Sequence, residues 1–312
     1  MKLITSVELK RIPNPISYQS KLVLLGSCFA ENMGNQFAQL GFTSHTNPFG
    51  ILFHPLALQR LVERAIRADY FTQSDLVQHN GLWHCFELHS VCSNVDSVEM
   101  LSEINAKLNA LKAQLEQATH ICITLGTAWV YRHLERDEVV ANCHKISQNQ
   151  FAKELLSVAQ IENALQELMT AIHAVNPSVQ VVFTISPVRH SKDGLVENQR
   201  SKAHLLVALH HLLEKCSAYY FPAYEILLDE LRDYRFYADD LLHPSDLAVR
   251  YIWDKWLSAT TTPETQALIT EVEAVQKSRQ HRPFNPDTAE HQAFLEKLDK
   301  KVEELQEKGV KT

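Results

Sequence analysis

The chain has 312 residues, 45% of them hydrophobic, which is enough to bury a substantial core without disulfide or metal staples. Its 30 basic and 37 acidic residues give a formal charge of -7, so the composition argues against an electrostatic nucleic-acid binder and against a lipid-binding patch. Six cysteines are scattered without a CxxC pair, so their spacing indicates neither a zinc site nor a disulfide framework.

The amino-terminal stretch places Lys10 and Arg11 before any apolar run of signal-peptide length, so we expect no secretory signal. The sequence has no run of about 18 consecutive apolar residues, which a membrane-spanning helix requires. No histidine-carboxylate spacing stands out as a metal site among the sixteen histidines. We therefore expect a soluble, cytoplasmic protein that uses no metal or cofactor and has no nucleic-acid or membrane partner.

Five apolar runs have the length and composition of strands that are buried on both faces of a parallel sheet. They are Leu22 to Leu25, a weaker run at 41–46, His120 to Leu125, Val179 to Ile185 and Tyr219 to Tyr224. Apolar residues spaced three and four apart predict helices between them, one from Phe29 to Leu40 and one from Ile161 to Ile172. Because strands that alternate with such helices need right-handed crossovers, the pattern predicts a doubly wound α/β sheet.

Two polar-tipped segments interrupt this alternation. The pair Asn80-Gly81 lies between strand-like flanks, which is the strongest short-range signal for a β-hairpin. The stretch 129–143 has the pattern of a second hairpin after the central strand. We expect both hairpins to be insertions that cover a sheet edge or the strand ends, because neither continues the parallel pattern.

The composition changes after residue 257. Apolar residues at helical spacing run through the highly charged carboxyl-terminal segment, at Phe294, Leu298, Val302 and Leu305. This pattern predicts a solvated helix packed through one stripe, with self-association as the alternative. We thus expect an α/β domain over 1–257 and a helical extension over 258–312, which either packs on the domain or projects from it.

The stretch LVLLGSCFAENMG, residues 22–34, joins the first predicted strand to the first predicted helix. Ligands of open α/β sheets bind beyond the carboxyl ends of the strands, so this corner is a candidate site. Ser27 would lie at the helix N-terminus, where backbone N–H groups can stabilise the oxyanion that a serine nucleophile creates. Two alternatives stay open: Ser27 is only the helix cap, or Cys28 is the nucleophile, because a helix N-terminus lowers a thiol pKa.

Asp240 and His243, in the stretch DDLLHP, are the candidate partners of that nucleophile. They are three residues apart in a predicted loop, before a helix that starts after Pro244. One loop can therefore present an imidazole together with a carboxylate that orients it. A turn with incidental acidic residues would have the same spacing.

Six motifs resemble those of the GSCFA family, which is named for the pentapeptide at 26–30. In chain order they read LLGSCFAENMG, NPFGILFHP, ITLGTAWVYR, ISPVRH, DDLLHP and HRPFNP. The GSCFA family in turn resembles the GDSL/SGNH hydrolases, which have a flavodoxin-like, three-layer α/β/α fold with a mainly parallel sheet. This resemblance implies that Ser27 is the nucleophile, His243 the general base and acid, and Asp240 the orienting carboxylate.

The same resemblance implies an oxyanion hole. Its donors would be the backbone N–H groups of Ser27 and Gly50 and an asparagine in a Gly-x-Asn block, but that block reads Gly-Thr-Ala at 126–128. Either Asn47 or the Thr127 hydroxyl replaces the missing amide, or the hole is incomplete. The loss of one donor costs about a hundredfold or more in rate.

Several residues near the predicted strand ends could contact a substrate. Arg189 and His190 follow the fourth predicted strand, and His89 and Lys202 could join them. A basic lining suits a substrate with a carboxylate or a phosphate. Trp129 could line a sugar or acyl pocket. For each of these side chains, a structural ion pair, a surface position or ordinary packing explains the residue equally well.

We therefore expect an SGNH-type serine hydrolase that cleaves small acyl or acetyl esters through an acyl-enzyme. Its partner would be a small-molecule ester or an acylated glycan. An O-acyltransferase would use the same site, with an acceptor hydroxyl in place of water. Two further candidates are a noncatalytic binding protein with a degenerate oxyanion hole and a thiol-based enzyme that acts through Cys28.

Overall fold

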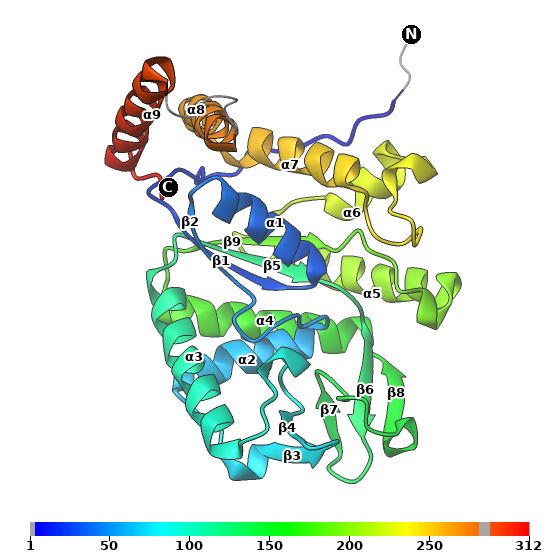
Figure 1. Cartoon of the computed structure of the whole chain (residues 1–312). Coiled ribbons are helices and arrows are strands. Elements are labelled where there is room, and N and C mark those ends of the chain that lie inside the picture. The colour runs from blue at the N-terminus through cyan, green and yellow to red at the C-terminus, as the bar shows by residue number, and fades with distance from the viewer. Residues whose placement is uncertain (1–3, 281–287, 312) are drawn as a thin grey trace.

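Five parallel strands form the centre of the computed structural model, which describes residues 4–280 and 288–311 (Figure 1). They lie in the order β10-β9-β5-β1-β2, with the bounds β1 Lys21–Gly26, β2 Thr43–Thr46, β5 His120–Leu125, β9 Gln180–Ile185 and β10 Tyr219–Tyr220. The strand order reverses between β1 and β5, as in flavodoxin-like sheets, and ligands bind at such reversals. The HRPFNP motif, at 281–286, lies outside the described residues.

Helices cover both faces of the sheet, which confirms the predicted three-layer α/β/α fold (Figure 1). One layer contains α2 Pro55–Arg67, α3 Ser97–Gln117, α4 Val158–Val175 and α5 Leu195–Leu213. The other contains α1 Cys28–Gln39, α6 Ala223–Glu225, α7 Asp246–Thr260, α8 Pro263–Gln280 and α9 Ala289–Glu307.

The inner strands β1, β5 and β9 are mainly apolar because each of their faces meets a helical layer. In β1, Val23 and Leu25 belong to the core cluster that includes α2 to α5, whereas Leu22 and Leu24 belong to the cluster that includes α1 and α7. This alternation follows from the two-residue period of a strand. Full burial of such a side chain contributes about 1.5–3 kcal/mol.

The last central strand is shorter than the sequence predicts. Only Tyr219 and Tyr220 pair, with Val182 and Phe183 of β9. Pro222, which has no N–H group to donate to a neighbouring strand, then precedes α6.

Two small antiparallel sheets are inserted into this framework. The first is the predicted hairpin, with β3 Leu76–His79 and β4 Leu82–Cys85 joined by a turn in which both central residues have positive φ. The second contains β6 Trp129–His133 and β7 Glu138–Val140, but a third strand, β8 Phe151–Leu155, pairs with β6. The pattern of the sequence does not predict β8, because most of its residues are only half-buried or exposed and no continuous apolar run marks it.

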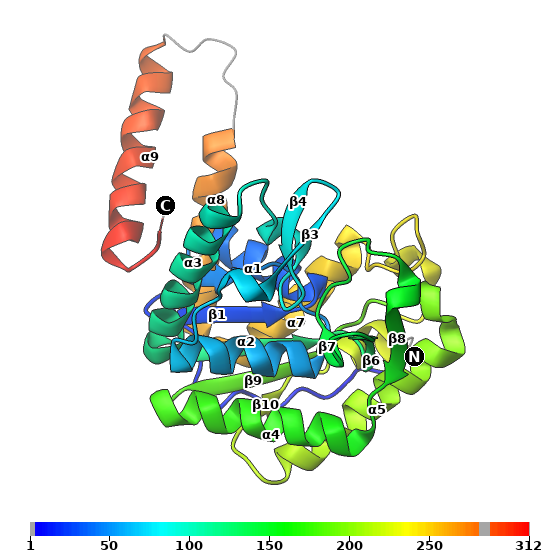
Figure 2. The ribbon, with the colours of Figure 1, turned by 90° about the horizontal axis from the view of Figure 1, so that it is seen from below.

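The carboxyl-terminal helices contribute to the core of the main body. Ile269, Val272, Val302 and Leu305 are buried in the cluster that includes α1 and α7, whereas Phe294 is 38% exposed. Figure 2 shows α8 and α9 side by side at one end of the molecule. None of the helices in residues 4–280 and 288–311 is long and apolar enough to cross a bilayer.

Candidate functional site

A cavity of about 930 Å³ opens beyond the carboxyl ends of the central strands. Its walls come from the segments that follow β1, β2, β5 and β9, from the loop before α7 and from the β6–β8 sheet. Six residues singled out by the sequence analysis line it: Cys28, Thr127, Trp129, Arg189, His190 and His243. The cavity therefore lies where ligands of flavodoxin-like sheets bind.

Ser27 is the N-cap of α1. Its residue is 1% exposed, and its Oγ accepts a hydrogen bond from the Phe29 N–H at 3.3 Å. Its own backbone N–H donates to the Thr124 carbonyl at 3.1 Å. Gly26, which precedes it, has φ of 129°, and a Cβ there would lie 2.1 Å from the Thr124 oxygen. The close approach of β1 to β5 therefore requires glycine at this corner.

Cys28 is the first residue of α1, and its half-buried side chain lines the cavity. Burial raises the pKa of the Cys28 thiol, and the positive charge of Lys202 acts in the opposite direction. The carboxylate of Glu31 also raises this pKa, whereas the backbone N–H groups of Phe29 and Cys28 lower it. The thiol at rest is therefore protonated, and its activation needs a base.

Asp240 and His243 form a hydrogen-bonded pair at the mouth of the cavity. Asp240 Oδ2 lies 2.6 Å from His243 Nδ1, and Asp240 Oδ1 accepts the backbone N–H groups of Leu242 and His243 at 2.9 and 3.0 Å. These contacts lower the pKa of Asp240 to about 2. Leu241, with φ of 58°, turns the chain so that both side chains come together. The carboxylate of Asp240 favours the tautomer of His243 with its proton on Nδ1, and within the described part of the chain Nε2 makes no hydrogen bond.

The predicted oxyanion donors are mostly engaged within the protein. The Gly50 N–H donates to the Asn47 carbonyl at 2.8 Å. The Thr127 hydroxyl lies 3.0 Å from Ser201 Oγ and accepts the Trp129 N–H at 3.0 Å. Together with the engaged Ser27 N–H, these contacts leave few of the donors that the family resemblance implies.

Asn47 retains an unused donor. It is 9% exposed, and its Oδ1 accepts the Gly26 N–H at 2.9 Å, which holds its amide next to the β1–α1 corner. Its Nδ2 is buried and has no hydrogen-bond partner among the residues that the structure describes. Asn47 has φ of 40°, a left-handed conformation that asparagine tolerates better than most residues.

A stripe of polar side chains on α5 supports the floor of the site. Asn198, Ser201 and Lys202 are 2%, 1% and 0% exposed. The Asn198 Oδ1 accepts the His190 N–H, and Ser201 Oγ accepts the Ala128 N–H. The sequence analysis named only Lys202 among them. The signal it missed is the helical spacing, because these three residues share the buried face of α5.

The Lys202 side chain is buried under the carboxyl ends of β5 and β9. Its Nζ donates to the carbonyl oxygens of Gly126 and Ser186, both at 2.7 Å. Burial is the main reason that the pKa of Lys202 is lowered to about 7; Cys28 acts in the opposite direction, and the charge of Arg189 adds to the lowering. The charge of Lys202 therefore lowers the pKa of Cys28, and the charge of Cys28 raises the pKa of Lys202.

Three of the predicted substrate-binding residues line the cavity, namely Arg189, His190 and Trp129. Arg189 Nε and His190 Nε2 are buried without a hydrogen-bond partner within the described part of the chain, and burial lowers the pKa of His190 to about 4. Trp129 Nε1 donates to the Glu197 carbonyl, while Lys153 Nζ lies 4.7 Å from the centre of its ring. His89 does not line the cavity; its Nδ1 accepts the Val91 N–H at 3.3 Å.

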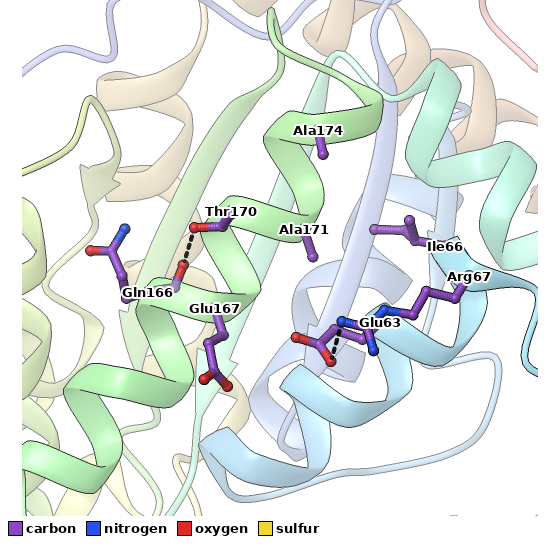
Figure 3. Close-up of a pocket in the computed structure, with 8 residues that line it drawn as sticks. All are labelled: Glu63, Ile66, Arg67, Gln166, Glu167, Thr170, Ala171 and Ala174. Carbon is purple, nitrogen blue, oxygen red and sulfur yellow. Dashed lines mark hydrogen bonds and ion pairs between the residues drawn. The ribbon is translucent and has the colours of Figure 1, made fainter.

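A second hollow, of about 490 Å³, lies between α2 and α4 (Figure 3). Its lining includes Glu63, Arg67 and Glu167 but no histidine, cysteine or serine. Within residues 4–280 and 288–311, no group of three or more His, Cys, Asp or Glu side chains could hold a metal ion. The large cavity contains a thiol, that of Cys28, and the imidazole of His243, which is hydrogen-bonded to the Asp240 carboxylate.

The comparisons with known proteins agree with the family resemblance. The family model described as "GSCFA family" matches residues 21–256, and that of the "GSCFA domain protein, C-terminal domain" matches residues 272–311. A comparison with curated proteins finds no match. The solved structures that match include an acetyl xylan esterase, Est2A, from the rumen bacterium Butyrivibrio proteoclasticus, with 15% identity and a TM-score of 0.28. The match covers 70% of this chain and spans 57% of that one.

Proposed function

The chain belongs to the GSCFA family, and for it we propose the hydrolysis of small acyl esters through an acyl-enzyme formed in the large cavity. The observation that carries the proposal is the Asp240–His243 pair. Its 2.6 Å hydrogen bond leaves His243 Nε2 as the free nitrogen of an imidazole that lines the cavity. That arrangement is what a general base in acyl transfer requires.

In this mechanism His243 takes the proton of a nucleophile at the Ser27–Cys28 corner. The nucleophile attacks the acyl carbon, and the alcohol leaves with the proton that His243 returns. Water, deprotonated by His243, then cleaves the acyl-enzyme. Asp240 keeps the imidazole in one tautomer and stabilises the imidazolium. Asn47 does not line the cavity, but its amide is held beside the β1–α1 corner, and its Nδ2, a buried donor without a partner in the described structure, is the candidate to stabilise the oxyanion.

The cavity walls support a proposal for the substrate class. Arg189 and His190 supply polar groups, and Trp129 with its neighbours on β6 supplies an aromatic and apolar surface. An acetyl or other short acyl ester on a sugar fits such a lining. An O-acyltransferase would use the same groups, with an acceptor hydroxyl in place of water.

The test is turnover of short p-nitrophenyl esters and of an acetylated oligosaccharide. We expect wild type to release the alcohol and His243→Ala to lose about 100-fold or more of that rate. His211→Ala, which changes an exposed histidine of α5, is the matched control and should keep the wild-type rate. Equal rates for wild type and His243→Ala would overturn the proposal.

A noncatalytic binding function is the second candidate, because the backbone N–H groups of Ser27 and Gly50 are both engaged within the protein. A site without oxyanion donors could still hold an acylated glycan in the same cavity. Calorimetric binding of an acetylated oligosaccharide, with no acetate released over hours, would favour this function over hydrolysis.

A further inference from the structure

We propose that Cys28, and not Ser27, is the attacking residue of this site, and that buried Lys202 is the positioning residue that stabilises its thiolate. The inference rests on the proposed ester hydrolysis and names the nucleophile for it. The intermediate would then be a thioester.

The side chains of Ser27 and Cys28 have different surroundings, although the two residues are neighbours in the chain. Ser27 is 1% exposed and does not line the cavity, and its Oγ accepts the Phe29 N–H as the N-cap of α1. Cys28 is the next residue, and the first turn of α1 directs its half-buried side chain to the cavity wall. Since a nucleophile must reach the acyl carbon, the thiol has the better access.

Cys28 shares the cavity with an imidazole that is held by a carboxylate. The same walls contain His243, whose Nδ1 is held by Asp240. No hydrogen bond joins Cys28 to His243 within the described residues, and such bonds often tighten only when substrate binds. A thiol, an imidazole and a carboxylate are the three groups that thiol hydrolases use on unrelated folds.

Lys202 also acts electrostatically on Cys28. Lys202 is 0% exposed, and two of its three N–H bonds go to the carbonyl oxygens of Gly126 and Ser186. A cation fixed in this way costs free energy to bury, and an anion nearby offsets that cost. Among the charged groups acting on Cys28, Lys202 favours the thiolate and Glu31 opposes it. Lys202 therefore favours the thiolate that forms when His243 takes the Cys28 proton.

The reaction balances with water as the co-reactant. His243 Nε2 accepts the thiol proton, the Cys28 sulfur bonds to the acyl carbon, and the carbon–oxygen bond of the ester breaks. The alkoxide takes the proton back from His243 and leaves as the alcohol. Water then gives a proton to His243, and its oxygen bonds to the acyl carbon. The carbon–sulfur bond breaks, and the sulfur takes the proton from His243. The products are a carboxylic acid and the restored thiol.

The experiment compares wild type, Ser27→Ala, Cys28→Ala and Cys28→Ser on p-nitrophenyl acetate, with acid quenching and peptide mapping of the acetylated residue. We expect the acetyl group on Cys28, removable by neutral hydroxylamine as a thioester is. Cys28→Ala should lose about 1000-fold or more in turnover. Ser27→Ala should still form the adduct. Cys216→Ser, which changes a half-buried cysteine outside the cavity, is the control with wild-type turnover.

Each outcome decides the matter. An acetyl group on Ser27, or wild-type turnover in Cys28→Ala, would overturn the inference while ester hydrolysis stands. No ester cleavage and no adduct on any residue would overturn the proposed function together with the inference. If Cys28→Ala does not fold, Cys28→Ser keeps the comparison, because its adduct would be an oxygen ester that resists neutral hydroxylamine.

The role of Lys202 has its own readout. We expect Lys202→Met to raise the pH at which iodoacetamide alkylates Cys28. Cys143, a second half-buried cysteine of the same cavity, is the internal control, because burial alone raises its pKa, to about 11. An unchanged pH profile at Cys28 in a folded Lys202→Met chain would exclude the positioning role.

Discussion

Asp240 Oδ2 lies 2.6 Å from His243 Nδ1, while the other carboxylate oxygen of Asp240 accepts two backbone N–H groups from its own loop. The carboxylate is therefore held from both sides. A loop of four residues supplies both side chains, and the Ala238 N–H, just before it, donates to the His243 carbonyl at 2.8 Å.

We expect Asp240→Asn to reduce kcat on a cleavable ester by about 1000-fold or more, because the amide no longer holds the tautomer that leaves Nε2 free. The adjacent, exposed Asp239→Asn is the control and should stay near the wild-type rate. Steady-state kinetics on the two variants measures the difference. A rate loss of similar size in both variants would show that loop disruption, and not the carboxylate, is responsible.

The same variant should change acid stability. The pKa of Asp240 is about 2 in the fold, below the value of about 3.9 in an unfolded chain. The ionised carboxylate thus stabilises the fold above about pH 4, and this contribution is lost as the pH falls toward 2. In urea titrations, the difference in unfolding free energy between wild type and Asp240→Asn should be constant above about pH 5 and shrink toward pH 2.

Lys202 should make the fold more stable as the pH rises. Its pKa of about 7 lies below the unfolded value of about 10.4, so between these values the unfolded chain binds more protons than the folded one. The free energy of unfolding should therefore gain from this group between about pH 7 and 10. Lys202→Met should reduce that slope and the exposed Lys21→Met should not. Parallel slopes in all three chains would contradict this expectation.

Gly26→Ala should prevent stable folding. The added Cβ would lie 2.1 Å from the Thr124 carbonyl oxygen at φ of 129°, so β1 and β5 would have to separate. We expect a loss of about 3 kcal/mol or more. Gly81→Ala is the matched control, because Gly81 also has positive φ but no heavy atom within 4 Å of the added Cβ. Its cost should be about 1 kcal/mol. Equal urea midpoints for the two variants would show that the contact with Thr124 does not matter.

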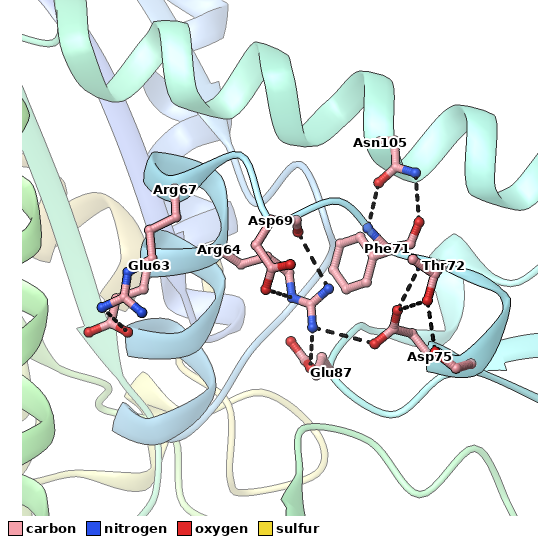
Figure 4. A network of polar contacts seen from close by, with 10 residues as sticks. Glu63, Arg64, Arg67, Asp69, Phe71, Thr72, Asp75, Glu87 and Asn105 are labelled. Carbon is pink, nitrogen blue, oxygen red and sulfur yellow. Dashed lines mark hydrogen bonds and ion pairs between the residues drawn. The ribbon is translucent and has the colours of Figure 1, made fainter.

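Arg64 should contribute far more to the free energy of unfolding than Arg67 does. Figure 4 shows its guanidinium among Asp69, Asp75 and Glu87. The Arg64 side chain is 14% exposed. Its carbon Cζ also lies 4.3 Å from the centre of the Phe71 ring. Arg64→Met would leave these carboxylates without their cation.

We expect Arg64→Met to lower the unfolding free energy by about 3 kcal/mol, because partly buried acidic groups lose their partner. Burial already raises the pKa of Glu87 against the effect of Arg64, and the variant should raise it further. Arg67, whose side chain is 72% exposed, pairs only with Glu63 among the described acidic residues. Arg67→Met should cost less than about 0.5 kcal/mol. Thermal or urea unfolding of both variants tests the difference.

Leu305→Ala tests whether the carboxyl-terminal extension packs on the α/β domain. Leu305 of α9 is 0% exposed in the cluster shared with α1 and α7, so its truncation should cost about 2–5 kcal/mol. Leu295→Ala, at a position 38% exposed on the same helix, should cost less than about 0.5 kcal/mol. A Leu305→Ala chain as stable as wild type would indicate that α9 does not contribute to the folded core.

Local patterns were sufficient wherever one element decides its own structure. The apolar run at 120–125 coincides with β5, and the helix predicted from Ile161 to Ile172 lies within α4. The Asn80-Gly81 turn forms the expected hairpin. β8 escaped the sequence analysis because its stability comes from pairing with β6 and not from an apolar run of its own. The strand at Tyr219 was predicted too long because its apolar run continues past Pro222, where the chain already turns into α6.

The candidate site divides in the same way. The contact between Asp240 and His243 is local, so three residues of spacing were enough to predict it. The buried stripe of Asn198, Ser201 and Lys202 on α5 depends on which carbonyl and amide groups the ends of β5 and β9 bring to that helix face. No pattern within α5 could reveal those partners.

By itself, the sequence determined the alternation of strands and helices, the glycine corner after β1 and the acid–imidazole loop, because each depends on residues close together in the chain. Only the tertiary structure decided which side chain of the Ser27–Cys28 pair reaches the cavity and which cation lies beneath it. The physical reason is that adjacent side chains at a strand-to-helix turn point in different directions. The groups that each side chain meets are set by β5, β9 and α5, which lie about 100 to 180 residues away.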